Sequence, residues 1–119
     1  MRVVFVDSSF YIAFVHARYV TSPAVILEVL AYFSRLGPRL RERAALLAER
    51  LIESSIVDVV ALDEGLLRAA VDLYRRRLDK RYSLADCLGM AICRERRITE
   101  ILSTDRDFET EGFTILLKR

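Results

Sequence analysis

Four acidic residues stand alone among apolar neighbours or directly after strand-like segments, and they are Asp7, Glu28, Asp86 and Asp105. A buried, ionised carboxylate costs several kcal/mol unless a partner compensates it. The apolar segments around the first three contain no lysine or arginine. We therefore expect the four side chains to converge and share hard cations, because Mg²⁺ and Mn²⁺ prefer carboxylate oxygen. The only histidine, His16, cannot build a zinc site.

Each acid also has an ordinary structural interpretation. Asp7 would cap a following helix, Glu28 would reach a surface rim or pair with a distant arginine, and Asp105 would be a turn residue. The run Ser83-Leu84-Ala85-Asp86 fits a capping box. The whole pattern is more specific than its members, because two acids follow strand ends and two lie about one turn into helices with polar caps.

Apolar, β-branched and aromatic runs alternate with helical patterns along the chain. The expected strands are residues 3–6, 19–21, 56–61, 101–102 and 113–117. Strands that alternate with helices predict an α/β fold with a parallel sheet. In such sheets, functional sites form beyond the carboxyl ends of the strands. That edge is therefore where we expect the acids to meet.

The helices that should carry these residues have recognisable ends and faces. The first helix is expected over residues 8 to about 15, and the second from Pro23 to about Leu36 after the cap Ser22. A third helix should carry the apolar stripe Leu40, Ala44, Leu47, Ala48 and Leu51. A fourth helix should follow the cap Asp63, and a fifth should run from Ser83 to about Arg96. The helix after Asp63 should bury Leu66, Leu67, Ala70, Val71, Tyr74 and Leu78. The helices of Glu28 and Asp86 are apolar almost all round, so both should be buried.

Composition limits the class of protein. The chain has 119 residues, 53% of them hydrophobic, and a net charge of +2. We expect one domain over residues 1–119, with a core and without disordered tracts. No run reaches the roughly 18 apolar residues of a membrane span, and no secretory segment opens the chain, so we expect a cytoplasmic protein. Cys87 and Cys93 share one apolar helix and should be buried and reduced.

The acidic motifs, taken in order, resemble those of PIN-domain ribonucleases, especially the VapC-type toxins of type II toxin–antitoxin pairs. The resemblance lies in Val6-Asp7-Ser8-Ser9, in Val20-Thr21-Ser22 followed by Glu28 and Leu30, in Ser83-Leu84-Ala85-Asp86, and in Ser103-Thr104-Asp105-Arg106-Asp107-Phe108. It covers nearly the whole chain. It implies a three-layer fold: a five-stranded parallel sheet in order 3-2-1-4-5 with helices on both faces. In that order strands 1 and 4 are neighbours, which would bring Asp7 next to Asp105.

The resemblance implies a metal-dependent endoribonuclease that hydrolyses RNA phosphodiester bonds with Mg²⁺ or Mn²⁺. Two such ions can activate water and stabilise the leaving oxygen. Asp7 would be the central ligand, Asp86 and Asp105 would complete the metal sites, and Glu28 would bind directly or through water. Three further residues would support these ligands, unless they only cap helices or turns: Ser9, Ser103 and Asp107.

A dense basic run precedes the helix of Asp86. It comprises Arg75, Arg76, Arg77, Lys80 and Arg81. These cations would neutralise RNA phosphates. Cations at the end of a helix are also favoured by the helix dipole, so a purely structural role stays open.

The chain departs from the family in one respect. Family members usually carry an extra helix between the first helix and the second strand, whereas here His16-Ala17-Arg18 runs directly into Tyr19. Parallel neighbours need a crossover of about a dozen residues, and eight helical residues return about 12 Å. The connection is therefore tight, and a monomer closed on itself and a dimer with an exchanged N-terminal strand both stay open.

The expected partners follow from the same resemblance. They are an RNA substrate, a small antitoxin protein and a second copy of the chain in a homodimer. The shortened N-terminal half also leaves open a non-catalytic module that binds metal or RNA on the same fold. A phosphatase or receiver domain is disfavoured, because no lysine follows the late strands in the required context.

Overall fold

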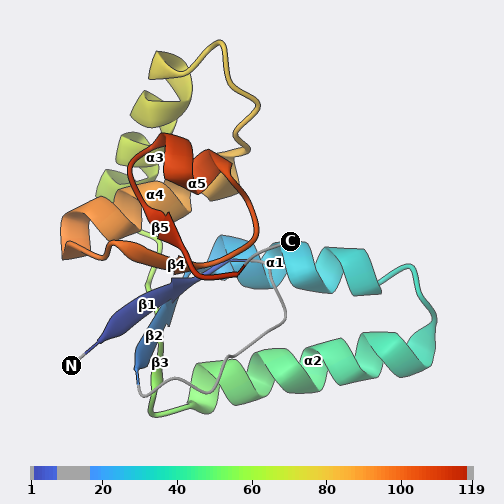
Figure 1. The fold of residues 1–119 in the computed structure, drawn as a ribbon. Coiled ribbons are helices and arrows are strands. Elements are labelled where there is room, and N and C mark those ends of the chain that lie inside the picture. Colours follow the sequence, from blue (N-terminus) through green and yellow to red (C-terminus); the bar gives the residue numbers. More distant parts are fainter. Residues whose placement is uncertain (1, 8–16, 118–119) are drawn as a thin grey trace.

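The computed structural model describes residues 2–7 and 17–117, and it contains a parallel sheet of five strands in order β3-β2-β1-β4-β5 (Figure 1). The strands are β1 (Val3–Val6), β2 (Arg18–Thr21), β3 (Val57–Val59), β4 (Glu100–Leu102) and β5 (Thr114–Ile115). All neighbouring pairs are parallel. The predicted fold class and strand order are confirmed, and the strands lie where their apolar runs placed them.

Alternate residues of the central strands enter two separate apolar clusters. The first contains Phe5, Val20 and Ile101 together with the buried faces of α3 (Glu64–Arg76) and α4 (Leu84–Arg96). The second contains Val4, Tyr19 and Leu102, with Leu51 of α2 (Pro38–Glu53) packed against it. Successive side chains of a strand point to opposite faces, so helices cover both faces of the sheet.

Helix α4 is buried as its apolar sequence predicted. Cys87 and Cys93 are fully buried, which confirms their prediction as packing residues. At Gly89 a Cβ would lie 3.0 Å from Cε1 and Cζ of the Phe5 ring. Glycine thus lets α4 approach β1 more closely than any other residue would allow. This contact sets how closely the first turns of α4, which carry Asp86, lie against β1.

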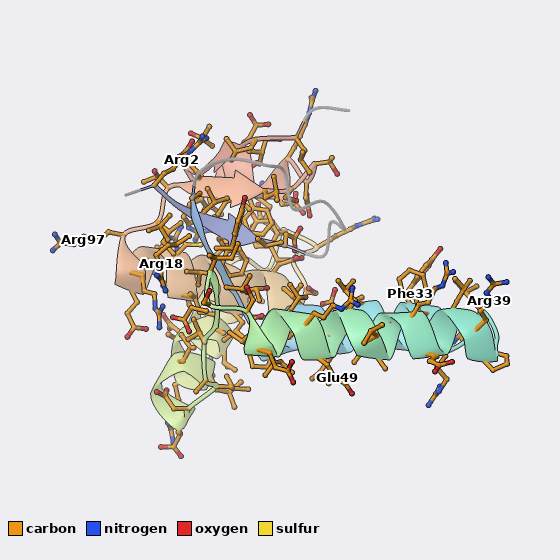
Figure 2. The ribbon with its side chains drawn as sticks, turned by 90° about the horizontal axis from the view of Figure 1, so that it is seen from below. Arg2, Arg18, Phe33, Arg39, Glu49 and Arg97 are labelled. Atoms are coloured by element: carbon orange, nitrogen blue, oxygen red, sulfur yellow. The ribbon has the colours of Figure 1, made fainter. Side chains whose placement is uncertain are left out.

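Helices α1 (Pro23–Phe33) and α2 form a hairpin that extends well away from the sheet (Figure 1). Ser22 caps α1 by accepting a 3.2 Å hydrogen bond from the Val25 N–H, as predicted. The expectation that this helix is buried is wrong, since Val25 is its one buried residue while Leu27 and Tyr32 are 67% and 63% exposed. Figure 2 shows the reason, because Phe33 lies far out along the hairpin, where no sheet is available to cover it.

Two other expectations about helices need correction. In α3 the buried residues are Leu66, Ala70 and Leu73, whereas the predicted Leu67, Val71 and Tyr74 are exposed. The predicted Leu78 is also exposed and lies beyond the end of the helix. The buried face of α3 is the one that packs against α4, and it is not the face that carries the most apolar residues. The short helix α5 (Asp107–Thr110) was not predicted, because four residues give no periodic signal.

The first strand is paired within its own chain. Val4 is in register with Tyr19 of β2 and with Glu100 of β4. The short connection between β1 and β2 is therefore compatible with a monomer that closes on itself, without exchange of the first strand. Residues 8–16 of that crossover, including the predicted helix and Ser9, lie outside the described residues. Among the helices that the structure describes, none has the length and apolar character needed to cross a membrane.

Candidate active site

The ends of β1 and β4 meet at the centre of the sheet's carboxyl edge. Val6 is in register with Leu102, and the Asp7 N–H donates to the Leu102 carbonyl at 3.4 Å. The hydroxyl of the buried Ser103 donates a 2.7 Å hydrogen bond to Oδ2 of Asp7. The end of β4 therefore holds the carboxylate that follows β1.

The same Ser103 hydroxyl organises the next acid along the chain. Its Oγ accepts a 3.0 Å hydrogen bond from the Asp105 N–H. Asp105 Oδ1 in turn accepts a 2.9 Å bond from the Asp107 N–H at the start of α5. Ser103 thus connects Asp7 to the loop of Asp105, and part of the Asp105 carboxylate also serves as a turn cap.

Asp86 approaches this edge from the first turn of α4. It is half-buried and forms the complete capping box, with Ser83 N–H donating to Asp86 Oδ2 at 2.9 Å and Asp86 N–H donating to Ser83 Oγ at 3.1 Å. Burial raises the pKa of Asp86, hydrogen bonding of its carboxyl group by the backbone and side chain of Ser83 opposes that rise, and the charges of Asp7 and Asp105 add to it. Asp86 therefore caps its own helix and is also influenced by the charges of the other acids.

Glu28 lies on α1, near the rim of this edge. The Thr21 hydroxyl donates to the Val6 carbonyl at 2.9 Å, which fixes the end of β2, and the Ser22 cap starts α1 directly after it. Burial raises the pKa of Glu28, and the charges of Asp86 and Asp7 raise it further. The Glu28 side chain is nonetheless among the exposed ones, so it borders the cluster from outside.

The charge of Asp7 thus acts on the carboxyl groups of both Glu28 and Asp86, and the charge of Asp105 acts on Asp86. A cation bound among these acids would relieve this repulsion. Among residues 2–7 and 17–117, no three His, Cys, Asp or Glu side chains are close enough together to hold one ion. The donor chemistry still fits Mg²⁺ or Mn²⁺, because Mg²⁺ is usually held by one or two carboxylates and keeps several waters.

The chain matches the family model described as PIN domain over residues 4–112. It belongs to the PIN domain family. The match spans all four acidic motifs, and the observed strand order is the one that this resemblance implied.

Solved structures similar to this PIN domain extend the comparison. One is the VapC20 toxin of Mycobacterium tuberculosis, described as cleaving the sarcin–ricin loop, with 26% identity, a TM-score of 0.81 and coverage of 93% of this chain and 96% of that one. Another is FitAcB from Neisseria gonorrhoeae, with 12% identity, a TM-score of 0.58 and coverage of 96% of both chains, which shows the fold alone. No curated protein sequence matches the chain.

Asp107 lies within electrostatic reach of the acids of this PIN domain. Burial raises its pKa, Asp105 and Asp86 add to the rise, and Lys80 opposes it. It is therefore in electrostatic contact with the cluster from the start of α5. This position is compatible with the supporting role expected for it.

A cavity of about 240 Å³ borders Asp7 on another side. Its walls come mainly from apolar side chains of α1 and α2, such as Val29 and Leu47, together with Tyr19 of β2. The other three acids are not among its described lining residues. We therefore separate this apolar cavity from the carboxylate cluster.

The basic run before α4 divides into groups with different partners. Arg76 pairs with Asp72 one turn earlier on α3 at 3.0 Å. Arg77 donates from Nε and Nη2 to Glu111 at 2.9 and 3.2 Å, so its guanidinium is committed to a carboxylate. Lys80 approaches its neighbour Asp79 at 3.7 Å, and both side chains remain partly or largely exposed.

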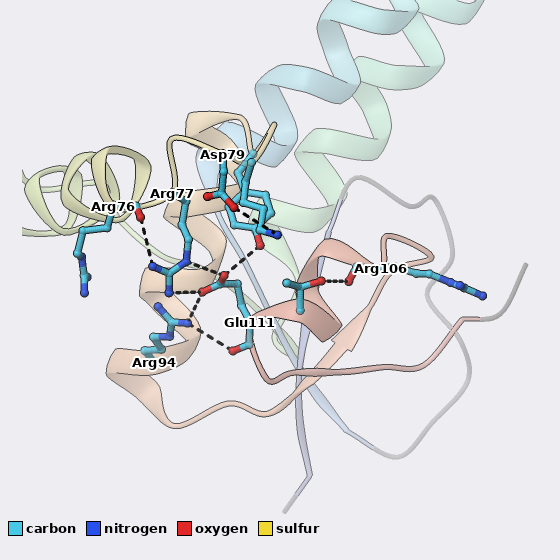
Figure 3. Close-up of polar contacts among 9 residues, drawn as sticks. Arg76, Arg77, Asp79, Arg94, Arg106 and Glu111 are labelled. Atoms are coloured by element: carbon cyan, nitrogen blue, oxygen red, sulfur yellow. Dashed lines mark hydrogen bonds and ion pairs between the residues drawn. The ribbon is translucent and has the colours of Figure 1, made fainter.

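Glu111 accepts hydrogen bonds from three side chains, a contact that the sequence did not predict. Its side chain is only 4% exposed and accepts hydrogen bonds from Arg77, from Arg94 Nη2 at 2.9 Å and from the Tyr82 hydroxyl at 3.0 Å (Figure 3). The hydrogen bond from Arg77 comes first among the causes that hold the pKa of Glu111 at about 2. These partners are 17 to 34 positions away, so no local motif marks the contact.

Proposed function

We propose that this chain is a metal-dependent endoribonuclease that hydrolyses RNA phosphodiester bonds and acts as the toxin of a toxin–antitoxin pair. The observation that carries the proposal is the hydrogen-bonded link from Asp7 through Ser103 to the Asp105 loop at the carboxyl edge of the sheet. The charge of Asp7 also acts on the carboxyl groups of Asp86 and Glu28 there. The likeness to a toxin that cleaves ribosomal RNA in its sarcin–ricin loop supports the same reaction class. Such an enzyme would meet its RNA in the cytoplasm.

In the proposed mechanism, Asp7, Asp86 and Asp105 would hold Mg²⁺ or Mn²⁺, and Glu28 would contribute directly or through water. The bound cations would supply the positive charge that polarises the phosphodiester and stabilises the leaving oxygen. Ser103 orients Asp7 by donating to its Oδ2. Ser83 likewise fixes Asp86 through its Oδ2. These hydrogen bonds hold the ligands in place before a cation arrives.

The backbone N–H of Ser83 also favours the ionised form of Asp86 against the effect of burial. A hydrogen bond to the charged form lowers the pKa of a carboxyl group. For Asp86 this effect opposes burial and the charges of Asp7 and Asp105. The protein thus retains negative charge where the cations would bind.

The second candidate function is a non-catalytic module that binds metal or RNA. The shortened connection before β2, where His16-Ala17-Arg18 runs directly into Tyr19, favours it. The two functions differ in their response to metal. We expect purified protein to cleave single-stranded RNA with Mg²⁺ or Mn²⁺ and to lose that activity in EDTA. Binding of RNA without cleavage under both conditions would select the non-catalytic module.

We also propose an antitoxin protein and a second copy of the chain as partners. The pairing of β1 with β2 and β4 of the same chain favours a dimer of closed protomers over an exchanged one. Solution mass measured across a concentration series tests the dimer. A monomer at the highest concentration would remove the homodimer from the proposal.

A further inference from the structure

A small cavity with basic and aromatic walls lies between the end of α3 and the loop that leads to α4. Its volume is about 210 Å³, and it is lined by Tyr74, Arg77, Leu78, Lys80, Arg81 and Tyr82. Drug-sized ligands occupy pockets of roughly 300–1,000 Å³. The cavity therefore suits a single planar ring rather than a whole organic ligand.

The ring of Tyr74 and the side chain of Leu78 are 52% and 82% exposed at this cavity. Two apolar groups left open to water beside cations form the type of surface on which a nucleobase stacks. Elsewhere on α3, the cavity beside Arg68 and Arg75 is lined by Glu64 and Asp72 and contains no aromatic residue. The combination of ring and cation is therefore particular to the end of the helix.

The cavity lies within electrostatic reach of the carboxylate cluster. The charge of Lys80 acts on Asp107, and the charge of Asp107 acts on Tyr82. The chain also continues from this cavity directly into the capping box of Asp86. A nucleotide seated here would thus have its neighbour in the strand near the acids.

The walls of the cavity are held in place before any ligand binds. Glu111 anchors Arg77 at the end of α3 and Tyr82 at the end of the loop through the same carboxylate (Figure 3). Between these anchors, the Lys80 ammonium makes a 3.7 Å contact with the largely exposed Asp79, a weak type of pair. A phosphate can displace such a partner at little cost, whereas the anchored residues need no reordering.

We infer that this cavity is a nucleotide subsite of the proposed nuclease, in which a base of single-stranded RNA stacks on Tyr74 while Lys80 and Arg81 contact its phosphates. The inference rests on the proposed function. It assigns phosphate contact to only two residues of the basic run, Lys80 and Arg81. Arg77 acts as a positioning residue through Glu111. Arg75 and Arg76 lie outside the subsite.

The test is the affinity of the protein for a fluorescein-labelled 12-nucleotide single-stranded RNA of mixed sequence, measured in EDTA so that metal-dependent cleavage is stopped. We expect Tyr74→Ala to weaken binding about fivefold or more, because stacking on one aromatic ring is lost. Tyr74→Phe should bind within about twofold of the parent protein. Lys80→Gln and Arg81→Gln should each weaken binding and reduce the slope of log affinity against log salt by about 0.7.

The matched control is Arg68→Gln, which removes one charge from an exposed position earlier on α3. It should leave the affinity unchanged. Equal weakening by Arg68→Gln and Lys80→Gln would show a diffuse positive field and overturn the subsite. Equal binding by Tyr74→Ala and Tyr74→Phe would overturn the stacking contact. Thermal melting of each variant shows whether the fold is intact.

Failure of the subsite and failure of the nuclease are distinguishable. If the parent protein cleaves RNA with Mg²⁺ or Mn²⁺ but the Tyr74, Lys80 and Arg81 variants bind like it, the subsite is wrong and the nuclease stands. If the variants weaken binding as expected but the parent protein cleaves nothing, the subsite stands and the catalytic proposal falls.

Discussion

The hydroxyl of Ser103 joins two acids that are far apart in sequence, because it donates to Asp7 at 2.7 Å while accepting from the Asp105 N–H at 3.0 Å. Ser103 is 1% exposed, so this geometry is shielded from water. The bridge connects the ends of β1 and β4, which are neighbours in the sheet. It makes the orientation of one proposed metal ligand depend on the loop that carries another.

Ser103→Ala should therefore impair cleavage more than stability. The hydroxyl orients Asp7, and loss of a group that orients a metal ligand typically costs about 10- to 100-fold in activity or metal affinity. The lost hydrogen bonds should lower the free energy of unfolding by about 1 kcal/mol. Cleavage rates and denaturant titrations measure the two effects. Ser55→Ala, at an exposed serine, is the control that should change neither, and a Ser103→Ala variant with the full cleavage rate would contradict the orienting role.

Divalent cations should stabilise the fold, and more so as pH rises. Burial and neighbouring acids raise the pKa of Glu28 and of Asp86 above 4.5 and 3.8. The stability that these groups contribute is complete below those unfolded values and is lost as pH rises through the raised folded values. A bound cation relieves the repulsion that remains at neutral pH.

Thermal unfolding with Mn²⁺ and with EDTA, at pH 5 and pH 8, measures this effect. We expect Mn²⁺ to raise Tm more at pH 8, because protons compete with the metal at pH 5. Glu28→Gln should raise Tm in EDTA and reduce the gain from Mn²⁺. An equal increase in Tm from Mn²⁺ at both pH values would show that these carboxylates do not bind the metal.

Glu111→Gln should destabilise the protein by roughly 2–3 kcal/mol at neutral pH, because one amide cannot accept from two arginines and a tyrosine. Hydrogen bonds from Arg77 come first among the causes that lower the pKa of Glu111 from 4.5 to about 2. A lowered pKa gives stability that is complete above pH 4.5 and lost as pH falls towards about 2. The parent protein should lose stability across that window.

The control for Glu111 is the exposed Glu109 in the same short helix. Glu109→Gln should change the free energy of unfolding by less than about 0.5 kcal/mol and keep the acid-induced loss. Urea titrations at pH 7 and pH 3 distinguish the two variants. If Glu111→Gln shows the same loss between these pH values as the parent protein, the anchor is energetically unimportant.

The strands and the positions of the acids were predictable because their signals are local. The apolar run before Asp7, the Ser22-Pro23 helix start and the capping box of Asp86 each occupy a few consecutive residues, and each is present in the structure. The parallel sheet then follows from the alternation of elements. The strand order, which the family resemblance and not the alternation implied, brings the ends of β1 and β4 together.

The errors arose where tertiary contacts overrode local patterns. Helix α1 was expected to be buried, but it pairs with α2 in an extended hairpin and exposes Leu27. The face of α3 turned out to be set by packing on α4, which buries Leu73 and exposes Val71. The Glu111 anchor joins residues that are distant in sequence, so only the folded structure could reveal it.

The single-turnover rate of RNA cleavage by Asp7→Asn, measured at saturating Mn²⁺ beside the parent protein, tests the central claim most directly. The substitution removes a charge and little volume, so the circular dichroism spectrum should not change. We expect the rate to fall by at least about a hundredfold, and Asp107→Asn to reduce it much less. Equal loss in both variants would mean that Asp107, rather than Asp105, is the closing acid of the site. An Asp7→Asn variant that cleaves as fast as the parent protein would contradict the carboxylate mechanism.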